Sequence, residues 1–297
     1  MRSLLFVPAD SERKIAKGMS SAADALILDL EDSVGPDNKP TARRMCVEVL
    51  GSVLGSALGS AKNDKKLFVR MNALDTPHAL ADLAAVVRAR PAGIMLPKCR
   101  GSQDMQTVSN YLSILETRDD VPQGSTLILP IVSETGAAMF GLGSYAEPHN
   151  PRLAGMLWGG EDLAADIGAV SNRDANGRYT PPYELARTLC LLAATSASVI
   201  AVDAVYTDFR DLKGLEEESI EAARAGYSAK CAIHPDQIEA INRVFTPSAE
   251  ALAWANRIIA AFDASPGAGV VSIDGKMIDM PHFKNARRLL ARSKPAA

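Results

Sequence analysis

Eight short apolar runs recur along the chain, and each is followed by a polar turn or by a segment with helical spacing of apolar residues. The runs are Leu4–Pro8, Ala25–Leu30, Leu67–Met71, Gly93–Pro97, Leu127–Val132, Ala154–Trp158, Ser198–Val202 and Lys230–Ile233. Continuous rather than alternating apolar runs indicate strands that are buried on both faces, as in parallel sheets. Apolar residues recur every three or four positions at Pro77–Ala89, Met105–Leu115, Pro182–Ala194 and Glu216–Ala225. Eight such units in order favour a (β/α)8 TIM barrel of the α/β class over an open doubly wound sheet.

The pattern changes after about residue 245. We therefore expect a barrel domain over 1–245 and a C-terminal helical extension over 246–297. A Gly/Pro break gives the extension a hinge, so it is either a mobile lid or a fixed cap on the barrel. Its segments are a helix over Ser248–Ala264, the break at Ser265–Gly269, a stretch Val270–Ile278 and a helix near Phe283–Ser293.

Composition excludes several classes of protein. The net charge is −3 and the pI is about 5.9, which makes nucleic acid and anionic membranes poor partners. No apolar segment reaches the roughly 18 residues that a membrane span requires. The four cysteines lie far apart and form no C-x-x-C pair, so we expect reduced core residues in a cytoplasmic protein.

Charged residues stand where the predicted strands end. In a (β/α)8 barrel, catalytic groups lie at the C-terminal ends of the strands. A convergent ring of acids with Arg and Lys has the makeup of a site for a metal ion and an anionic substrate. In chain order the residues are Asp29, Glu31, Asp32, Arg70, Lys98, Glu134, Glu161, Asp162, Asp203 and His234.

Glu134 and Asp162 are the candidate metal ligands. A buried strand needs no acid at its end in order to fold, and a hard cation such as Mg²⁺ is the usual partner of acids placed there. Either residue alone could equally begin a helix, because acids favour helix N-termini. The two together, on consecutive predicted strands, favour metal binding.

The other members of the ring have open alternatives. Arg70 offers a rigid fork of donors to a substrate oxygen, or else forms a buried ion pair with one of the acids. Asp29 is either structural, as a buried partner of Lys98 or Arg70, or part of the site. Glu31 and Asp32 lie nearer the mouth, where they could orient metal-bound water. His234 precedes a proline and is more readily explained as a structural terminus than as a base.

Segments spread over residues 2 to about 240 resemble the citrate lyase beta subunit family. That family lies within the HpcH/HpaI aldolase superfamily, which includes malyl-CoA and citramalyl-CoA lyases. The matching segments are Arg2–Ser11, Asp24–Val34, Val69–Asn72, Met95–Lys98, Glu134–Gly136, Gly160–Gly168 and Ala232–Pro235. Ile273–Pro281 looks like the segment that closes over the site in the CoA-lyase members. A departure occurs at Pro8-Ala9-Asp10, where the family often has glycine in the middle.

The resemblance implies a (β/α)8 barrel that binds Mg²⁺ through Glu134 and Asp162, with Arg70 on the substrate's oxygens. It implies that Arg13 and Lys14 bind CoA phosphates, although Lys17 could serve instead. Members are commonly trimers or larger assemblies, so a homo-oligomer, trimer or hexamer, is expected. Asp279 would then reach a neighbouring subunit's site, and we assign it the role of general acid/base. Lys98 is expected to contact substrate, and Glu31, Asp32 and Asp203 to support the site.

The expected reaction is Mg²⁺-dependent cleavage of a 3-hydroxy-3-carboxyacyl thioester to an acyl thioester and a 2-oxo acid. Malyl-, citramalyl- and citryl-CoA are examples of such thioesters. Three enzymatic alternatives remain open: an aldolase for free 2-oxo acids, a lyase for a thioester bound to a carrier protein, and an acyl-CoA thioesterase. A non-catalytic acyl-CoA-binding barrel is a fourth, which the number of intact mouth residues argues against.

Overall fold

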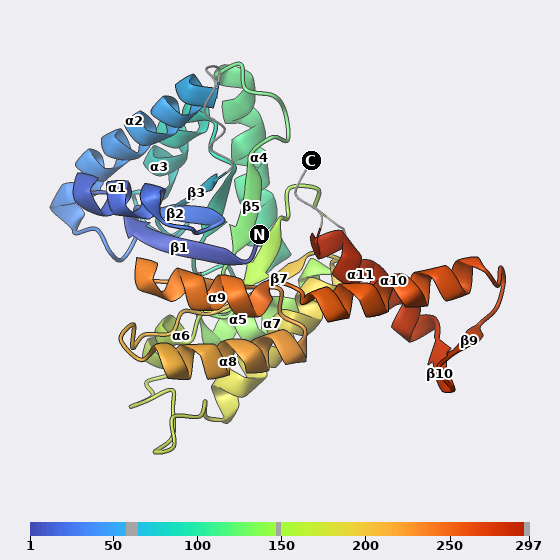
Figure 1. The fold of residues 1–297 in the computed structure, drawn as a ribbon. Coiled ribbons are helices and arrows are strands. Elements are labelled where there is room, and N and C mark those ends of the chain that lie inside the picture. Colours follow the sequence, from blue (N-terminus) through green and yellow to red (C-terminus); the bar gives the residue numbers. More distant parts are fainter. Residues whose placement is uncertain (58–64, 147–149, 294–297) are drawn as a thin grey trace. The chain divides into compact units, whose positions relative to one another are not determined.

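The computed structural model describes residues 1–57, 65–146 and 150–293, and the chain divides into two compact units (Figure 1). The first unit covers Met1–Asn242 and the second covers Arg243–Ala297. The last four residues of the predicted extension, 294–297, lie outside the described residues. Each unit has its own apolar core, so the two are described separately.

The first unit is built on an eight-stranded parallel sheet with the order β5-β4-β3-β2-β1-β8-β7-β6. The two end strands also meet, because Val132 N donates to Leu157 O at 2.8 Å and Ile131 bridges to Leu157 in parallel. The sheet therefore forms a nearly closed barrel, which confirms the predicted (β/α)8 fold. The strands are β1 Ser3–Pro8, β2 Ala25–Asp29, β3 Lys66–Arg70, β4 Gly93–Leu96, β5 Leu127–Pro130, β6 Gly155–Leu157, β7 Ile200–Asp203 and β8 Ala229–Ala232.

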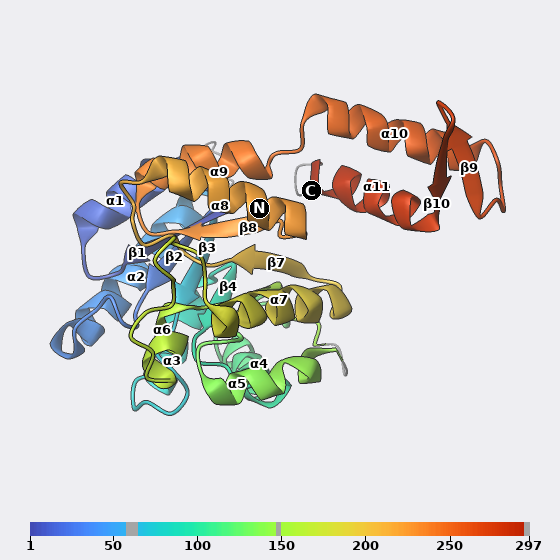
Figure 2. The same ribbon diagram turned by 90° about the horizontal axis from the view of Figure 1, so that it is seen from below.

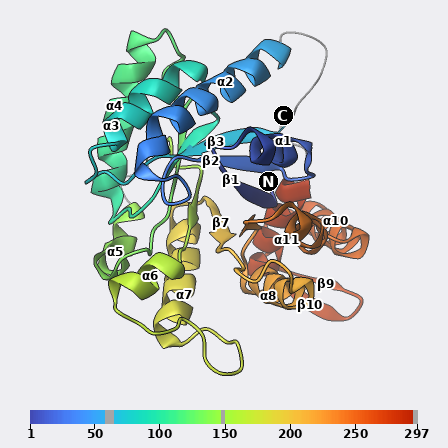
Figure 3. The ribbon, with the colours of Figure 1, turned by 90° about the vertical axis from the view of Figure 1, so that its left-hand side faces the viewer.

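Helices connect successive strands and cover the outside of the barrel. Figure 3 shows three of them, α2, α3 and α4, packed side by side on one flank. The α-helices of this unit are α1 Glu12–Ser20, α2 Lys39–Ala57, α3 Ala79–Val86, α4 Ser102–Arg118, α5 Gly136–Gly141, α6 Glu161–Asp166, α7 Pro181–Ser196 and α8 Leu212–Ala225, with α9 Ile238–Phe245 at its end. Short 3₁₀ turns are η1 Pro36–Asn38, η2 Val87–Ala89, η3 Leu142–Tyr145 and η4 Pro235–Gln237.

In each strand, every second side chain points into the barrel interior. Leu4, Ile27, Phe68 and Val202 belong to a single buried cluster there, together with Met95, Leu129, Leu157 and Cys231. Because side chains alternate along a strand, the residue two positions further on faces the same way. The last inward-facing residue of each strand therefore lies at the open end of the barrel, where the core gives way to the site.

The second unit consists of a helical pair and a hairpin. Its elements are α10 Ala249–Asp263, β9 Val270–Ile273, β10 Lys276–Asp279 and α11 Met280–Ser293. The predicted stretch Val270–Ile278 is thus a two-stranded antiparallel hairpin, in which Asp274 and Gly275 both take positive φ at the turn. Figure 2 shows the hairpin at one end of the α10–α11 pair. Phe262 and Ile278 are among the residues of its small core.

Two predictions from composition can be checked directly. All four cysteines are free and buried, as expected for reduced core residues. Within the portion of the chain that the structure covers, every helix is too short or too polar to cross a membrane.

Candidate active site

Asp29 and Arg70 form a buried ion pair at the open end of the barrel. They stand opposite each other in the register of β2 and β3, and each follows an inward-facing core residue by two positions. Arg70 Nε donates to Asp29 Oδ1 at 2.7 Å, and Nη2 donates to Oδ2 at 2.6 Å. Burial opposes the charge on Asp29, but the hydrogen bonds and charge of Arg70 outweigh it and lower the pKa of Asp29. The structure is compatible with both predictions for Arg70, the ion pair and the contact with substrate, because Arg70 pairs with an acid and also lines the cavity.

Asp29 also shapes the turn that follows β2. Its carboxylate accepts the backbone N–H of Glu31 at 2.9 Å and that of Ser33 at 3.3 Å. Lys39 Nζ donates to the carbonyl oxygens of Leu30 and Glu31, at 2.8 Å each. These bonds hold the turn over the mouth, where Glu31 is buried and Asp32 is exposed.

Lys98 joins the two halves of the acidic ring. Its ammonium pairs with Glu31 and lies 3.4 Å from Asp32 Oδ2 and 3.3 Å from Asp162 Oδ1. Burial works against the charge of Lys98, but the hydrogen bond to Glu31 and the charges of the three acids together raise its pKa. The predicted substrate-binding lysine is therefore engaged with side chains of the site itself.

Glu31 lies between two cations. Arg70 Nη1 is 2.8 Å from Glu31 Oε2, while the Lys98 ammonium contacts Oε1. Burial is nevertheless the largest influence and raises the pKa of Glu31, against the opposing effects of Arg70 and Lys98. The residue is only 4% exposed, so it contacts the two cations from within the protein rather than from the solvent.

Glu134 follows β5 and is almost fully buried. The neighbouring Thr135 caps α5, because its side chain accepts the backbone N–H of Ala138 at 3.1 Å. The Glu134 carboxylate does not cap that helix and instead accepts the backbone N–H of Lys98. Lys98 adopts a left-handed backbone conformation with φ of 51°, uncommon for a residue with a side chain. A helix N-terminus therefore does not account for the Glu134 carboxylate.

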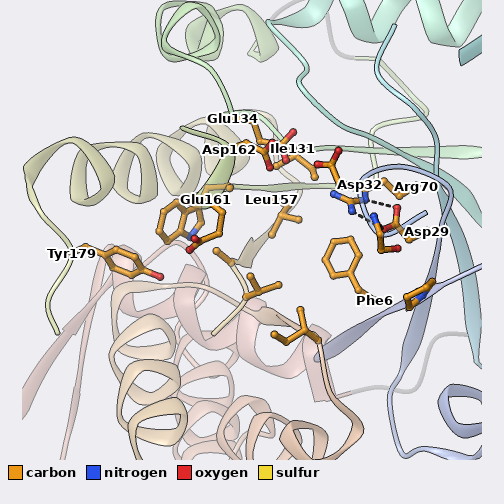
Figure 4. Close-up of a pocket in the computed structure, with 18 residues that line it drawn as sticks. Phe6, Asp29, Asp32, Arg70, Ile131, Glu134, Leu157, Glu161, Asp162 and Tyr179 are labelled. Atoms are coloured by element: carbon orange, nitrogen blue, oxygen red, sulfur yellow. Dashed lines mark hydrogen bonds and ion pairs between the residues drawn. The ribbon is translucent and has the colours of Figure 1, made fainter. Parts of the chain in front are cut away.

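Glu134 and Asp162 lie together on one side of the cavity, with Arg70 and Asp29 beside them (Figure 4). Burial, and next the negative charge of Asp162, raise the pKa of Glu134 well above its usual value. Gly159 leaves the room that the Glu134 side chain needs, because a Cβ atom there would lie 2.8 Å from Glu134 Cγ. A cation would stabilise this buried carboxylate beside the negative charge of Asp162.

The donor set fits a hard divalent cation. Mg²⁺ is commonly held by one or two carboxylates and keeps several water ligands. Among residues 1–57, 65–146 and 150–293, no three His, Cys, Asp or Glu side chains converge as a ready-made metal cage. The protein would therefore supply the two oxygen ligands of Glu134 and Asp162, and leave positions open for substrate.

The cavity has a charged half and an apolar half. Its volume is about 320 Å³, within the range of small-molecule sites. The charged residues come from the ends of β2, β3, β5 and β6, whereas the apolar side chains come mainly from β1 and from the ends of β6, β7 and β8. The apolar members include Phe6, Leu157, Trp158, Val205 and Ile233. A second hollow of about 440 Å³ shares Glu134 and Asp162 with the first.

Glu161 also lines the cavity and accepts a hydrogen bond from the Asn172 side chain, whereas Arg13, Lys14 and Asp279 lie outside this cluster. Arg13 and Lys14 are exposed on the first turn of α1, which begins just after β1 and so belongs to the same end of the barrel. Asp279 ends β10 in the second unit and interacts with His282, whose hydrogen bond lowers the pKa of Asp279. A proton carrier at neutral pH needs a raised pKa, so the second unit alone does not give Asp279 that property.

Asp203 does not face the cavity. Val202 belongs to the interior cluster, so Asp203 points outward between barrel and helices, where its carboxylate binds Lys230 and Arg187. It is linked to the site by Trp158, whose Nε1 donates to Asp203 Oδ1 at 2.8 Å. His234 caps η4, because its Nδ1 accepts the Asp236 N–H at the start of that turn.

Residue-by-residue reasoning missed the apolar half of the site. Phe6, Val205 and Ile233 stand at or just after strand ends, so their positions could have been found by extending the strand-end argument to apolar residues. Tyr179 lies in the connection between α6 and α7, far from any strand end. No sequence signal marks it as a residue of the cavity wall.

A profile of the HpcH/HpaI aldolase/citrate lyase family matches residues 2–235. This chain belongs to that family. The match covers the whole barrel and confirms the resemblance inferred from the strand-end motifs, and with it the prediction of a citrate lyase beta-like enzyme.

Two similar proteins are named for activities on CoA thioesters. The (3S)-malyl-CoA thioesterase of Cereibacter sphaeroides is 35% identical over 301 residues, covering 100% of this chain and 95% of that protein. The mitochondrial citramalyl-CoA lyase of Rattus norvegicus is 35% identical over 300 residues, covering 97% of this chain and 85% of that protein. Among solved structures, CitE from Mycobacterium tuberculosis in complex with magnesium, acetoacetate and coenzyme A has a TM-score of 0.75 and 32% identity, and covers 98% of this chain and 97% of its own.

Proposed function

We propose that this protein is a Mg²⁺-dependent lyase that cleaves, or in reverse forms, the carbon–carbon bond of a 3-hydroxy-3-carboxyacyl thioester. The products of cleavage are an acyl thioester and a 2-oxo acid. One observation carries the proposal: Glu134, Asp162 and Arg70 line the same cavity, at the open end of a barrel of this family. Relatives that act on malyl-CoA and citramalyl-CoA, and a CitE complex with magnesium and coenzyme A, support it.

Glu134 and Asp162 would hold the metal ion. Bound there, Mg²⁺ would supply Lewis-acid stabilisation of negative charge on the substrate's carboxylate and on the oxygen that becomes the oxo group. The raised pKa of Glu134 supports this assignment, because burial and the charge of Asp162 outweigh the stabilisation of its ionised form by the Lys98 N–H and by Arg70.

Arg70 would bind the substrate oxygen that gains charge. When the bond between the hydroxyl-bearing carbon and the α-carbon breaks, a base takes the hydroxyl proton and the hydroxyl-bearing carbon becomes the oxo carbon. The electron pair of the broken bond passes to the acyl thioester as an enolate, which is then protonated at the α-carbon. A guanidinium has five N–H groups, of which two donate to Asp29, while Nη1 forms an ion pair with Glu31 Oε2; further N–H groups would donate to the developing oxyanion. Asp29 and Glu31 hold the guanidinium plane in position, as an oxyanion site requires.

The proton donor at the α-carbon is proposed to be Asp279 from a second copy of the chain. This assignment rests on the resemblance of Ile273–Pro281 to the closing segment of CoA lyases. A homo-oligomer is part of the same proposal, as is the binding of CoA phosphates by Arg13 and Lys14. Glu31 and Asp32 are proposed to act at the mouth. Lys98 is proposed to exchange its contacts with the acids for a contact with the substrate carboxylate.

Thioester hydrolysis is the second candidate activity. It is favoured by the similarity to a (3S)-malyl-CoA thioesterase along the full length of this chain. The two activities share the metal pair and Arg70, since both place negative charge on an oxygen next to the metal. They differ in the bond that breaks, which is C–C in one and C–S in the other.

A panel assay tests the proposal. Malyl-CoA, citramalyl-CoA, a citryl thioester and free 4-hydroxy-2-oxo acids are each incubated with and without Mg²⁺, while oxo acid and free thiol are followed separately. Mg²⁺-dependent oxo-acid release from a thioester, ahead of thiol release, is the expected result. Thiol release without oxo acid would select the thioesterase, and cleavage of the free acids alone would select an aldolase. Activity that survives a chelator would contradict the metal assignment.

A further inference from the structure

The connection between α6 and α7 forms a wall of the cavity. Residues 171–180 fold back on themselves, with an antiparallel bridge from Arg173 to Tyr179 and a bond from Thr180 N to Asn172 O of 3.0 Å. The fold turns Tyr179 into the lining of the cavity, whereas Arg178 next to it is exposed (Figure 4).

Tyr179 forms this wall together with Trp158. Their rings meet edge to face, with centroids 5.0 Å apart and an interplanar angle of 77°. Trp158 is fixed on its other side by the bond from Nε1 to Asp203, in the layer between barrel and helices. Figure 4 shows Tyr179 on the side of the cavity opposite Arg70 and Asp29, and Trp158, which packs against Tyr179, lines the cavity as well.

Arg173 fastens Tyr179 in this place. Its guanidinium carbon lies 3.9 Å from the centroid of the Tyr179 ring, a stacked cation–π arrangement. Its Nη2 donates to Glu218 Oε2 on α8 at 2.6 Å, and its Nη1 donates to the Gly177 carbonyl oxygen at 2.8 Å. Glu218 is itself bound to the buried Lys230 at 2.9 Å. A single side chain thus ties a surface connection to the scaffold and supports one ring of the cavity wall.

We propose that Arg173 is a positioning residue that determines how tightly the acyl part of the thioester is bound, by holding Tyr179 against Trp158. The inference rests on the proposed lyase function. The charged half of the cavity suits the carboxylate and the oxo oxygen of the substrate, so the acyl carbons have only the apolar half left to them. A wall there contacts the acyl group before and during bond cleavage alike, and therefore affects KM more than kcat.

Three variants test the role of the guanidinium. Arg173→Gln removes the charge and the stacking, Arg173→Lys keeps the charge opposite Glu218, and Arg178→Gln is the control on the same connection. We expect Arg173→Gln to raise KM for the thioester roughly tenfold with kcat nearly unchanged, on the scale of one lost aromatic contact. Arg173→Lys should recover part of the affinity, and Arg178→Gln should behave as the unmodified protein. An equal loss of kcat and kcat/KM in Arg173→Gln would overturn the proposal.

A double-mutant cycle separates action through Tyr179 from a general effect on folding. If Arg173 acts through Tyr179, then Tyr179→Ala raises KM by itself, and adding Arg173→Gln to it changes KM little further. If the increases in KM of the two single variants multiply in the double variant, Arg173 acts independently of the ring, which contradicts the proposal.

Fluorescence gives a readout that does not depend on turnover. The chain has two tryptophans, so Trp254→Phe leaves Trp158 as the reporter of the cavity wall. In that background, Arg173→Gln and Tyr179→Ala should shift the Trp158 emission to the red alike, because water reaches the indole. If the unmodified protein turns over no thioester, the proposed function fails, and the emission then decides the positioning claim alone. An emission unchanged by Arg173→Gln would overturn it.

Discussion

Two ion pairs join neighbouring strands of this barrel, and they face opposite ways. Asp29 stands opposite Arg70 in the register of β2 and β3 and points into the barrel mouth. Asp203 stands opposite Lys230 in the register of β7 and β8, and points outward under α7 and α8. Both pairs are buried and have short contacts, of 2.6 Å in each case. The surroundings of each pair, rather than its own geometry, distinguish the pair in the site from the pair in the scaffold.

The difference lies in charge balance. The outward network contains Asp203, Glu218, Lys230, Arg187 and Arg173, so each carboxylate has a cation in direct contact. At the mouth, the two cations Arg70 and Lys98 pair with four carboxylates, those of Asp29, Glu31, Asp32 and Asp162, and burial together with the charge of Asp162 strongly raises the pKa of Glu134. A balanced buried network stabilises the fold, whereas an unbalanced one is ready to bind a cation.

The largest effect on activity is expected at Glu134. Glu134→Gln keeps the shape and the acceptor for the Lys98 N–H, but removes a metal ligand, so turnover should fall about 10³-fold or more, on the scale of a lost Lewis acid. Mg²⁺ binding by calorimetry should be lost in parallel. Glu184→Gln, at an exposed position on α7, is the control. Unchanged Mg²⁺ affinity in the Gln variant would place the metal elsewhere.

The same variant should not lose stability. The folded-state pKa of Glu134 is raised above the unfolded one, so the folded, metal-free chain loses stability as the pH rises from the unfolded value through the folded value. Glu134→Gln removes this loss, and its free energy of unfolding should match or exceed that of the unmodified protein at neutral pH. Urea unfolding in the presence of a chelator, at acidic and neutral pH, measures the difference.

The opposite result is expected at Asp203. Asp203→Asn leaves Lys230 buried with one partner fewer, which should lower the free energy of unfolding by about 3–5 kcal/mol. Urea unfolding measures this loss, with Asp37→Asn at an exposed position as the control. A variant of normal stability but much reduced turnover would show that the outward network belongs to the site after all.

Arg70→Lys tests whether the inward pair does more than stabilise. Lysine can remain close to Asp29 but lacks the planar fork, so kcat should fall roughly 10²-fold, on the scale of one lost oxyanion donor. Arg44→Lys on the exposed face of α2 is the matched control. Near-normal kcat would reduce Arg70 to a structural partner of Asp29, like Lys230 for Asp203.

The smallest effect is expected from the exposed cations of α1. Lys14→Ala and Arg13→Ala should raise KM for a CoA thioester roughly threefold at low salt, and less at high salt, because exposed charges are screened. Lys213→Ala, on the exposed face of α8, should leave KM unchanged. An effect that does not depend on salt would mean that these side chains act by something other than phosphate binding.

Much of the fold could be predicted because each of the eight strands corresponds to a continuous apolar run in the sequence. All eight strands of the barrel overlap their predicted runs by three residues or more, for example Ala25–Asp29 against Ala25–Leu30. The cluster at the mouth was predictable for a related reason, since parallel strands bring all their C-terminal ends to one edge. Glu31, Arg70, Lys98, Glu134 and Asp162 meet there accordingly.

The direction in which each strand-end side chain points could not be predicted. In a strand with one polar face, alternation tells the inside from the outside, but here both faces are buried and both read as apolar. Asp203 therefore looked like a member of the ring, although it faces the helices. Only the tertiary structure shows which alternate residues of each strand face inward. It also brings Tyr179 and Arg173 to the cavity wall through contacts between residues far apart in the sequence.

The amino-acid sequence alone determined the barrel, the end of the barrel that carries the chemistry, and the residue types gathered there. Only the packed structure decided which acids remain without a matching cation and which are neutralised in the scaffold. The physical reason is that charge balance depends on contacts between strands and helices far apart in the chain, whereas strand order and strand ends are encoded locally.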